Sequence, residues 1–131
     1  MKIIDTSVLF AYFNTSDSQH QKALKILNEI IAHEEVIMIS STVVLEIVTL
    51  NSIRKLNIKQ MENFIEDLLQ DKVSYFQYYY LSEKDFKTVL FDLRKIQKPL
   101  SLVDYSLIYL SQKNKGAEVI SFNRDLLKSL I

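Results

Sequence analysis

Short apolar segments rich in β-branched residues alternate along the chain with longer segments of helical periodicity. The predicted strands are residues 1–5, 36–40, 73–81 and 117–122. Between them, apolar residues recur at spacings of three and four, which predicts amphipathic helices. The predicted helices cover residues 23–31, 61–69 and 86–93. Because short strands alternate with helices, we expect an α/β fold: a three-layer α/β/α sandwich around a short-stranded, mostly parallel central sheet.

Capping residues indicate where helices begin or end in segments whose hydrophobic periodicity does not define them. Residues 43–50 are almost uniformly apolar, but the run Ser40-Ser41-Thr42 offers an N-cap just before them. Ser101 starts a buried helix over 102–110, and Gly116 closes it before the last strand. Residues 124–130 complete the chain with a helical turn or two.

The composition bounds both the organisation and the chemistry. The 131 residues include one glycine and one proline, which argues against an all-β fold and against flexible linkers, so we expect a single domain over 1–131. The absence of cysteine excludes disulfides and thiolate metal sites. Lys+Arg and Asp+Glu balance at 16 each, so there is no overall basic charge to attract nucleic acid.

Targeting features are missing from the sequence. The N-terminus lacks the pattern of a signal peptide, and no apolar stretch approaches the length of a membrane span. We therefore expect a cytoplasmic protein that does not bind membranes.

Several acidic or amide side chains follow the ends of predicted strands or start helices. They are Asp5, Glu46, Asp104, Asn123 and Asp125. In parallel sheets with right-handed crossovers, the carboxyl ends of strands and the N-termini of helices meet at one edge, where ligands bind. Glu46 and Asp104 lie in otherwise apolar helices, where an unpaired carboxylate is costly. A bound Mg²⁺ or Mn²⁺ ion would offset that cost and could activate water.

Each of these acids also has a purely structural explanation. Asp5 can cap the next helix, and Ser101-x-x-Asp104 is a variant of the capping box. Ser82-x-x-Asp85 has the same form and is given no function. Glu46 can be a core acid that a neighbouring side chain satisfies. The site interpretation is favoured because all these residues are expected at one edge.

Four motifs in this order resemble the PIN domain, and especially the VapC-type toxins of prokaryotic toxin–antitoxin pairs. The motifs are IIDTSVL, SSTVVLEIV, LSLVDYSLIYL and VISFNRDL. The resemblance implies a Mg²⁺- or Mn²⁺-dependent ribonuclease. It makes Asp5, Glu46 and Asp104 the catalytic acids and metal ligands, with Asp5 and Asp104 as the main ones. The hydroxyls of Thr6 and Ser7 would support Asp5 or contact a phosphate of the substrate.

One position departs from the pattern of the family. A fourth aspartate is frequent after the last strand, where this chain has Asn123. Asparagine can ligate a metal through its carbonyl oxygen but brings no charge, so a second ion would bind more weakly. We take Asn123 as a catalytic-site member and Asp125 as a surface or helix-start residue.

Basic and aromatic residues supply further candidates. Arg94 and Lys98 precede the Asp104 helix and could hold an RNA backbone, or could simply form a solvated helix end. The cluster of Arg54, Lys55 and Lys59 has the same two explanations, with the structural one slightly favoured. His20 is expected to be exposed and at most a supporting residue, and the tyrosines at 78–80 are expected to pack in a strand.

The sequence thus predicts an endoribonuclease, the toxin of a VapBC-type pair, and the resemblance further implies an RNA substrate, a VapB-like antitoxin and a homodimer. The alternatives are a PIN nuclease of RNA processing without an antitoxin, and a noncatalytic module that binds RNA or protein. A phosphatase or phosphoacceptor domain fits poorly, because Ser7 stands where the phosphatase needs a second acid.

Overall fold

The structure is a computed structural model that describes residues 1–130. The strands are β1 (Lys2–Ile4), β2 (Ile37–Ser40), β3 (Phe76–Tyr79) and β4 (Glu118–Ile120). The helices are α1 (Thr6–Phe13), α2 (His20–Ala32), α3 (Ser41–Ile53), α4 (Lys59–Leu69), α5 (Glu83–Ile96), α6 (Leu102–Lys113) and α7 (Arg124–Ser129).

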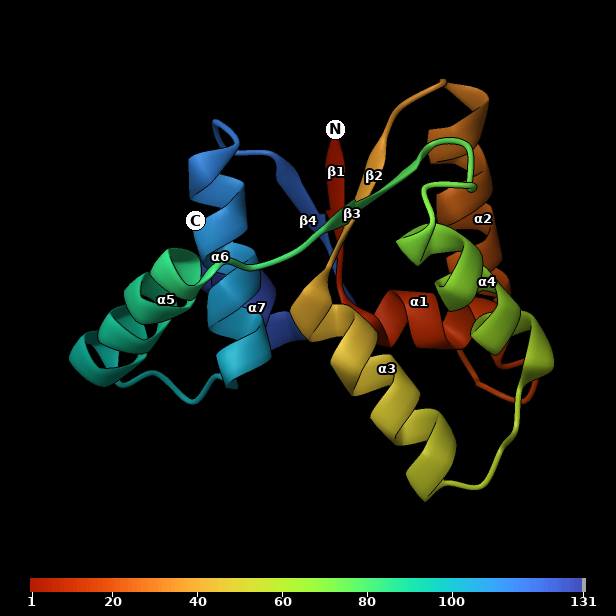
Figure 1. The fold of residues 1–131 in the computed structure, drawn as a ribbon, viewed down its shortest axis with the longest axis horizontal. Coiled ribbons are helices and arrows are strands. Elements are labelled where there is room, and N and C mark those ends of the chain that lie inside the picture. The colour runs from red at the N-terminus through yellow and green to blue at the C-terminus, as the bar shows by residue number, and fades with distance from the viewer. Residues whose placement is uncertain (131) are drawn as a thin grey trace.

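The strands form one four-stranded sheet in the order β3-β2-β1-β4. Every pairing is parallel, and Ile3 of β1 lies opposite Met38 on one side and Val119 on the other. In Figure 1, α2 and α4 flank the sheet on one side and α5 and α6 on the other, while α3 extends from its lower edge. This arrangement confirms the expected α/β sandwich, with a sheet that is parallel throughout.

The strands are shorter than the apolar segments that predicted them. β3 begins only at Phe76, because Tyr75 before it has a left-handed φ of 68° that an extended strand cannot contain. At the other end of the sheet, Ser121 and Phe122 leave β4 and lead into α7. The aromatic run therefore divides: Tyr78 and Tyr79 belong to the strand, whereas Tyr80 is 73% exposed.

Helix starts and ends follow the predicted caps. The Ser40 hydroxyl accepts a hydrogen bond from Val43 N at 3.3 Å and starts α3. Gly116, with φ of 75°, donates its N–H to Ser111 O and ends the turn after α6. The prediction that His20 is exposed is wrong, because its ring is half-buried and its Nδ1 lies 2.7 Å from Ala11 O, which joins α2 to α1.

The core lies on both faces of β1 and β2. Its largest fully buried side chains are Ile3, Ile4, Val8, Leu9, Leu27, Ile37, Ile39, Ile47, Met61, Leu107, Leu110 and Leu126. Strands buried on both faces have no polar alternation, which is why their sequences are continuous apolar runs. Within residues 1–130, none of the helices is both long and apolar enough to cross a membrane.

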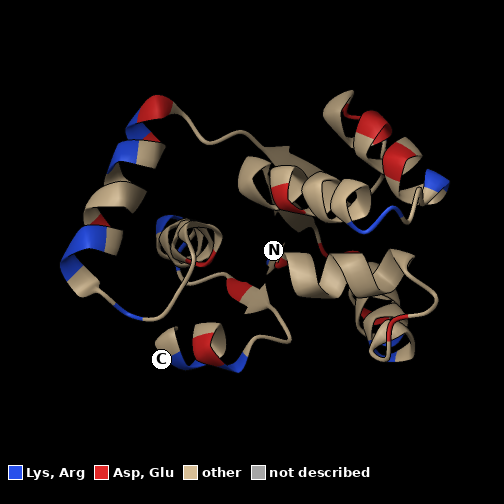
Figure 2. Ribbon diagram, turned by 90° about the horizontal axis from the view of Figure 1, so that it is seen from below, with Lys and Arg blue, Asp and Glu red and all other residues tan. Residues whose placement is uncertain are grey.

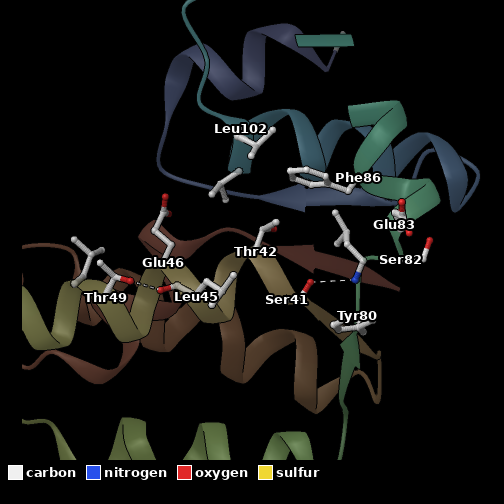
Figure 3. A pocket seen from close by; sticks show the side chains of 13 residues that line it. Ser41, Thr42, Leu45, Glu46, Thr49, Tyr80, Ser82, Glu83, Phe86 and Leu102 are labelled. Carbon is white, nitrogen blue, oxygen red and sulfur yellow. Dashed lines mark hydrogen bonds between the residues drawn. The ribbon is translucent and has the colours of Figure 1, made fainter. Parts of the chain in front are cut away.

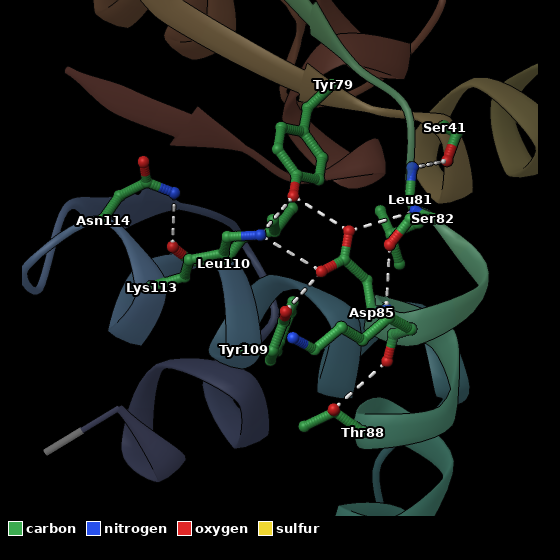
Figure 4. A network of polar contacts seen from close by, with 11 residues as sticks. Ser41, Tyr79, Leu81, Ser82, Asp85, Thr88, Tyr109, Leu110, Lys113 and Asn114 are labelled. Atoms are coloured by element: carbon green, nitrogen blue, oxygen red, sulfur yellow. Dashed lines mark hydrogen bonds and ion pairs between the residues drawn. The ribbon is translucent and has the colours of Figure 1, made fainter.

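A buried acid fixes α5 against the rest of the molecule. Asp85 completes the predicted capping box with Ser82 and is only 4% exposed. Its carboxylate also accepts hydrogen bonds from the hydroxyls of Tyr79 and Tyr109 and from the ammonium of Lys113, as Figure 4 shows. Burial opposes ionisation of Asp85, but these donors outweigh it and hold the pKa of the carboxyl well below its usual range. The network joins β3, α5 and α6.

Candidate active site

Asp5 ends β1 and caps α1, so its carboxylate lies at the carboxyl edge of the sheet. It is 4% exposed and accepts three hydrogen bonds: from Thr6 N at 2.8 Å, Ser7 Oγ at 3.1 Å and Ser121 Oγ at 2.6 Å. Burial raises the pKa of Asp5 more than these donors lower it, and the charge of Asp104 raises it further.

Ser7 and Ser121 form the support of this carboxylate. Ser7 Oγ accepts from Phe122 N at 3.1 Å, and Ser121 Oγ accepts from Asn123 N at 2.9 Å. Each hydroxyl thus takes its orientation from the chain after β4 and donates to Asp5. The sequence analysis anticipated a supporting role for Ser7 but missed Ser121, whose only signal is a hydroxyl directly after a strand at the same edge.

Asp104 combines a capping role with a place in the site. Its Oδ2 accepts from Ser101 N at 3.0 Å, and its own N–H donates to Ser101 Oγ at 3.1 Å, so the capping box is complete. The residue is 8% exposed and lines the same cavity as Asp5. The capping box at Asp104 is therefore confirmed, and its position is also compatible with the predicted site role.

Glu46 faces the two aspartates from α3. Partial burial raises its pKa, and the charges of Asp5 and Asp104 raise it further, while the hydroxyl of Thr6 opposes the rise. That hydroxyl is buried without a hydrogen bond of good geometry.

A chain of hydroxyls joins the starts of α3 and α6: Thr42 Oγ1 lies 2.7 Å from Ser40 Oγ and 2.8 Å from Ser106 Oγ.

Asn123 lies at the rim and serves as the N-cap of α7. Its Oδ1 accepts from Asp125 N at 3.0 Å and from Leu126 N at 3.3 Å, so the oxygen that could ligate a metal is engaged in capping. Asp125 is exposed in the first turn of α7, where the sequence analysis placed it.

The site residues share one cavity of about 500 Å³ at the carboxyl edge of the sheet, the edge toward which Figure 2 looks. It is lined by Asp5, Thr6, Ser7, Phe10, Asp17, Gln19, Glu46, Leu50, Arg54, Ser101, Asp104, Phe122 and Asn123. Every site residue that the acidic motifs indicated is present. Arg94 and Lys98 are not, and Lys98 lines a different cavity beside Tyr105.

The oxygen atoms that line this cavity are of the types that bind divalent cations. Carboxylate, hydroxyl and amide oxygens are the ligands that Mg²⁺ and Mn²⁺ prefer, and ionised carboxylates repel one another unless a cation compensates them. Among residues 1–130, however, no three His, Cys, Asp or Glu side chains are gathered closely enough to chelate one ion as they stand. The carboxylates of Asp5 and Asp104 are turned toward protein donors instead.

A larger cavity of about 670 Å³ lies next to the acidic one and differs from it in character. Figure 3 shows it between α3 and the start of α5, with Leu45, Phe86 and Leu102 on its walls and Glu46 at its margin. Its lining is mostly apolar and contains no group of converging carboxylates. The smaller cavity is therefore the candidate active site, and Glu46 borders both.

Comparison with known proteins shows to which family the chain belongs. The profile of the PIN domain matches residues 2–129. A comparison with curated protein sequences finds no match. Among solved structures, VapC20 of Mycobacterium tuberculosis, described as a Sarcin-Ricin loop cleaving toxin, is similar with a TM-score of 0.78 and 18% sequence identity, covering 98% of this chain and 95% of that one.

Two further structures share the fold. FitAcB from Neisseria gonorrhoeae has a TM-score of 0.65 at 16% identity, over 99% of this chain and 93% of that chain. VapBC2 from Rickettsia felis, bound to a DNA fragment from their promoter, has a TM-score of 0.64 at 18% identity, over 98% and 91%. At these identities the likeness shows the fold, whereas the profile match covers almost the whole chain. The chain therefore belongs to the PIN domain family, as its motifs predicted.

Proposed function

We propose that this protein is a metal-dependent endoribonuclease and the toxin of a toxin–antitoxin pair. The observation that carries the proposal is the meeting of Asp5, Glu46 and Asp104, from three different elements, in one cavity. Burial and mutual repulsion raise the pKa of both Asp5 and Glu46, so a bound divalent cation would lower the cost of ionising them. Membership of the PIN domain family supports nuclease chemistry.

Asp5 and Asp104 would hold an Mg²⁺ or Mn²⁺ ion, with Glu46 as a third ligand or as the residue that orients water. When bound, such an ion polarises a phosphoryl oxygen and lowers the pKa of water. Glu46 would accept the proton of the attacking water, because its carboxylate lines the same cavity as Asp5 and Asp104. Water would add to phosphorus and the P–O bond to the leaving ribose would break, giving one end with phosphate and one with hydroxyl.

Thr6 and Ser7 would act beside Asp5. Ser7 already donates to the Asp5 carboxylate, which keeps one oxygen of that group oriented. The Thr6 hydroxyl is buried and faces Glu46, so it would orient that carboxylate, and it would contact a phosphate oxygen only if the lining moved to expose it. In the same proposal Asn123 completes the rim, and Arg94 and Lys98 would contact only RNA that extends beyond the cavity.

The partners form the second part of the proposal. The fold likeness to VapC20 and to the VapBC2 complex supports a VapB-like antitoxin, which would cover the acidic cavity. It also supports a cytoplasmic setting in which RNA is the substrate.

A homodimer is supported by the apolar side chains around the larger cavity, where Leu45 is 70% exposed and Phe86 41%. Light scattering after size exclusion would measure the dimer, and Leu45→Arg would be expected to give monomers.

Cleavage of a mixed RNA pool by the purified protein tests the activity. We expect cleavage with Mn²⁺ or Mg²⁺, none with EDTA, and loss of at least a hundredfold in Asp5→Asn and in Asp104→Asn. Asp125→Asn is the matched control, because this exposed aspartate lies beside the site but outside the cavity. Folded wild type that cuts nothing with either ion would reject the nuclease and favour the noncatalytic RNA- or protein-binding module.

A further inference from the structure

Acidic side chains outnumber basic ones in the lining of the acidic cavity. Four carboxylates line it, those of Asp5, Asp17, Glu46 and Asp104, against one basic residue, Arg54. A polyanion such as RNA is repelled by such a surface unless cations hold its backbone on either side of the acids. We propose that Arg54 and Lys22, here called the phosphate clamp, hold the RNA backbone across this cavity; the inference rests on the proposed ribonuclease function.

Arg54 belongs to the same face of α3 as the catalytic glutamate. Glu46, Leu50 and Arg54 follow one another at intervals of four residues, so they lie along one side of the helix, and all three line the cavity. The guanidinium stands over the ring of Phe10, with Cζ 5.3 Å from the ring centroid. Phe10 also lines the cavity and is buried, so the ring provides a fixed surface for the cation.

Lys22 is exposed beside the cavity and reaches it through an aromatic residue of the lining, without lining the cavity itself. Its Nζ lies 5.4 Å from the centroid of Phe122, which lines the cavity after β4. The backbone N–H of Phe122 donates to Ser7 Oγ, the same hydroxyl that donates to Asp5. The ring below Lys22 is thus tied directly to the support of the catalytic carboxylate.

The two cations are held by rings and not by the nearby acids. None of the ion pairs found in residues 1–130 involves Arg54 or Lys22, although carboxylates line the cavity beside them. A cation that stacks on an aromatic face keeps its N–H groups available for another acceptor. A guanidinium in this state can bind a phosphate through two hydrogen bonds, and an ammonium acts as a point charge.

If Arg54 had a purely structural role, its substitution would have different effects. Arg54 is the C-cap residue of α3, and its stacking on Phe10 could simply stabilise that helix end. In that case its removal would lower the melting temperature without changing the number of ions released on RNA binding. The salt dependence of RNA affinity separates the two roles, because each phosphate contact on single-stranded nucleic acid contributes about 0.7 to the slope of log K against log salt.

The experiment measures the binding of a fluorescein-labelled, mixed-sequence single-stranded RNA by anisotropy over a series of NaCl concentrations. Asp104→Asn serves as the background, so that the RNA is not cut during the measurement. Arg54→Gln and Lys22→Gln are the clamp variants. Lys55→Gln and Lys25→Gln are matched controls. Each removes an exposed cation near its clamp residue that, unlike Arg54 and Lys22, is not found over an aromatic ring of the cavity lining within residues 1–130. Arg54→Lys keeps the charge but not the fork of donors.

We expect each clamp variant to bind RNA about three- to tenfold more weakly and to lower the salt slope by about 0.7, with both effects larger in the double variant. Arg54→Lys should keep the slope and lose part of the affinity. Equal affinity and slope in clamp and control variants, or no binding of RNA by the background protein, would overturn the clamp.

Cleavage assays in the wild-type background keep this inference distinct from the proposed function. The clamp variants should raise KM and leave kcat within about twofold, because their contacts lie beside the reacting phosphate. If wild type cleaves RNA but the clamp variants bind and cleave normally, the clamp is rejected and the nuclease stands. If the clamp variants lose RNA affinity but wild type never cleaves, the clamp stands and the nuclease is rejected.

Discussion

Ser121 Oγ lies 2.6 Å from Asp5 Oδ2, although the two residues are 116 positions apart in the chain. The contact exists because β4 pairs with β1 in parallel, so the ends of the two strands emerge side by side. It ties the first carboxylate of the proposed site to the segment that follows β4.

Ser121→Ala tests how far this hydroxyl sets the ionisation of Asp5. Loss of a donor to the carboxylate should raise the pKa of Asp5 further, since that hydrogen bond favours the ionised form. The acid limb of the cleavage–pH profile should then move to higher pH, and the free energy of unfolding should fall by about 1–2 kcal/mol. Ser129→Ala, which removes an exposed hydroxyl of α7, is the control. An unchanged profile would show that Ser121 acts only in packing.

Metal removal should reverse the usual effect of mild acid on stability. The folded-state pKa values of Asp5 and Glu46 lie above their unfolded values, so the folded protein binds more protons on acidification. In EDTA, the melting temperature should therefore rise as the pH falls from 7 toward about 4.5. Below about pH 3.8 it should fall, because the pKa of Asp85 is lowered by folding.

Calorimetry at a series of pH values measures this effect. Saturating Mn²⁺ should remove the rise, because the ion binds the ionised carboxylates and competes with protons. Asp5→Asn should have a smaller rise than wild type in EDTA. A melting temperature that falls steadily from pH 7 to pH 5 in metal-free protein would show that the acids do not oppose folding.

Asp85→Asn should loosen α5. The amide cannot carry the charge that the hydroxyls of Tyr79 and Tyr109 and the ammonium of Lys113 stabilise, so we expect a loss of about 2–3 kcal/mol in urea unfolding. Asp92→Asn, on the same helix and outside the ion pairs of the described residues, should change stability by less than about 0.5 kcal/mol. Hydrogen exchange should localise the loss to residues 83–96. Equal effects of the two variants would remove Asp85 as the anchor.

Asn123→Asp should strengthen metal binding without loss of stability. Aspartate caps a helix as well as asparagine does, so the bonds to Asp125 N and Leu126 N can persist. The added charge at the rim should lower the Kd for Mn²⁺ about tenfold, measured by isothermal titration calorimetry. Asp125→Asn is the matched control, because it removes a neighbouring charge outside the cavity. A Kd unchanged in Asn123→Asp would mean that position 123 serves only to cap α7.

The fold and the acidic residues could be predicted because both depend on local patterns. Alternating short strands and amphipathic helices require a parallel sheet, and such a sheet brings Asp5, the start of α3 and the start of α6 to one edge. The uniformly apolar segment of α1 has no polar face, so periodicity could not delimit it. Asp5 as a possible cap was the one sign of this helix, and the range of α1 was not predicted.

The remaining residues depend on relationships that no short window contains. Ser121 reaches Asp5 only through strand pairing. Arg54 was a candidate whose structural explanation was slightly favoured, because the sequence did not show that its position two helical turns from Glu46 lies in the same cavity. The prediction that Arg94 and Lys98 contact RNA assumed that the segment before α6 places these side chains near the acidic residues. Gln97 has a left-handed φ of 52° at the end of α5, and Lys98 N donates to the Tyr105 hydroxyl, so this segment follows another face of α6.

The pairing of β4 with β1 also determines when the cavity can exist during synthesis. β1 lies between β2 and β4, and Asp5 receives one of its donors from Ser121. A growing chain that has not yet reached the residues after β4 has an incomplete sheet and an Asp5 without that support. The proposed site is therefore complete only once the chain as far as Asn123 has been made, because Ser121, Phe122 and Asn123 supply part of the support and lining around Asp5.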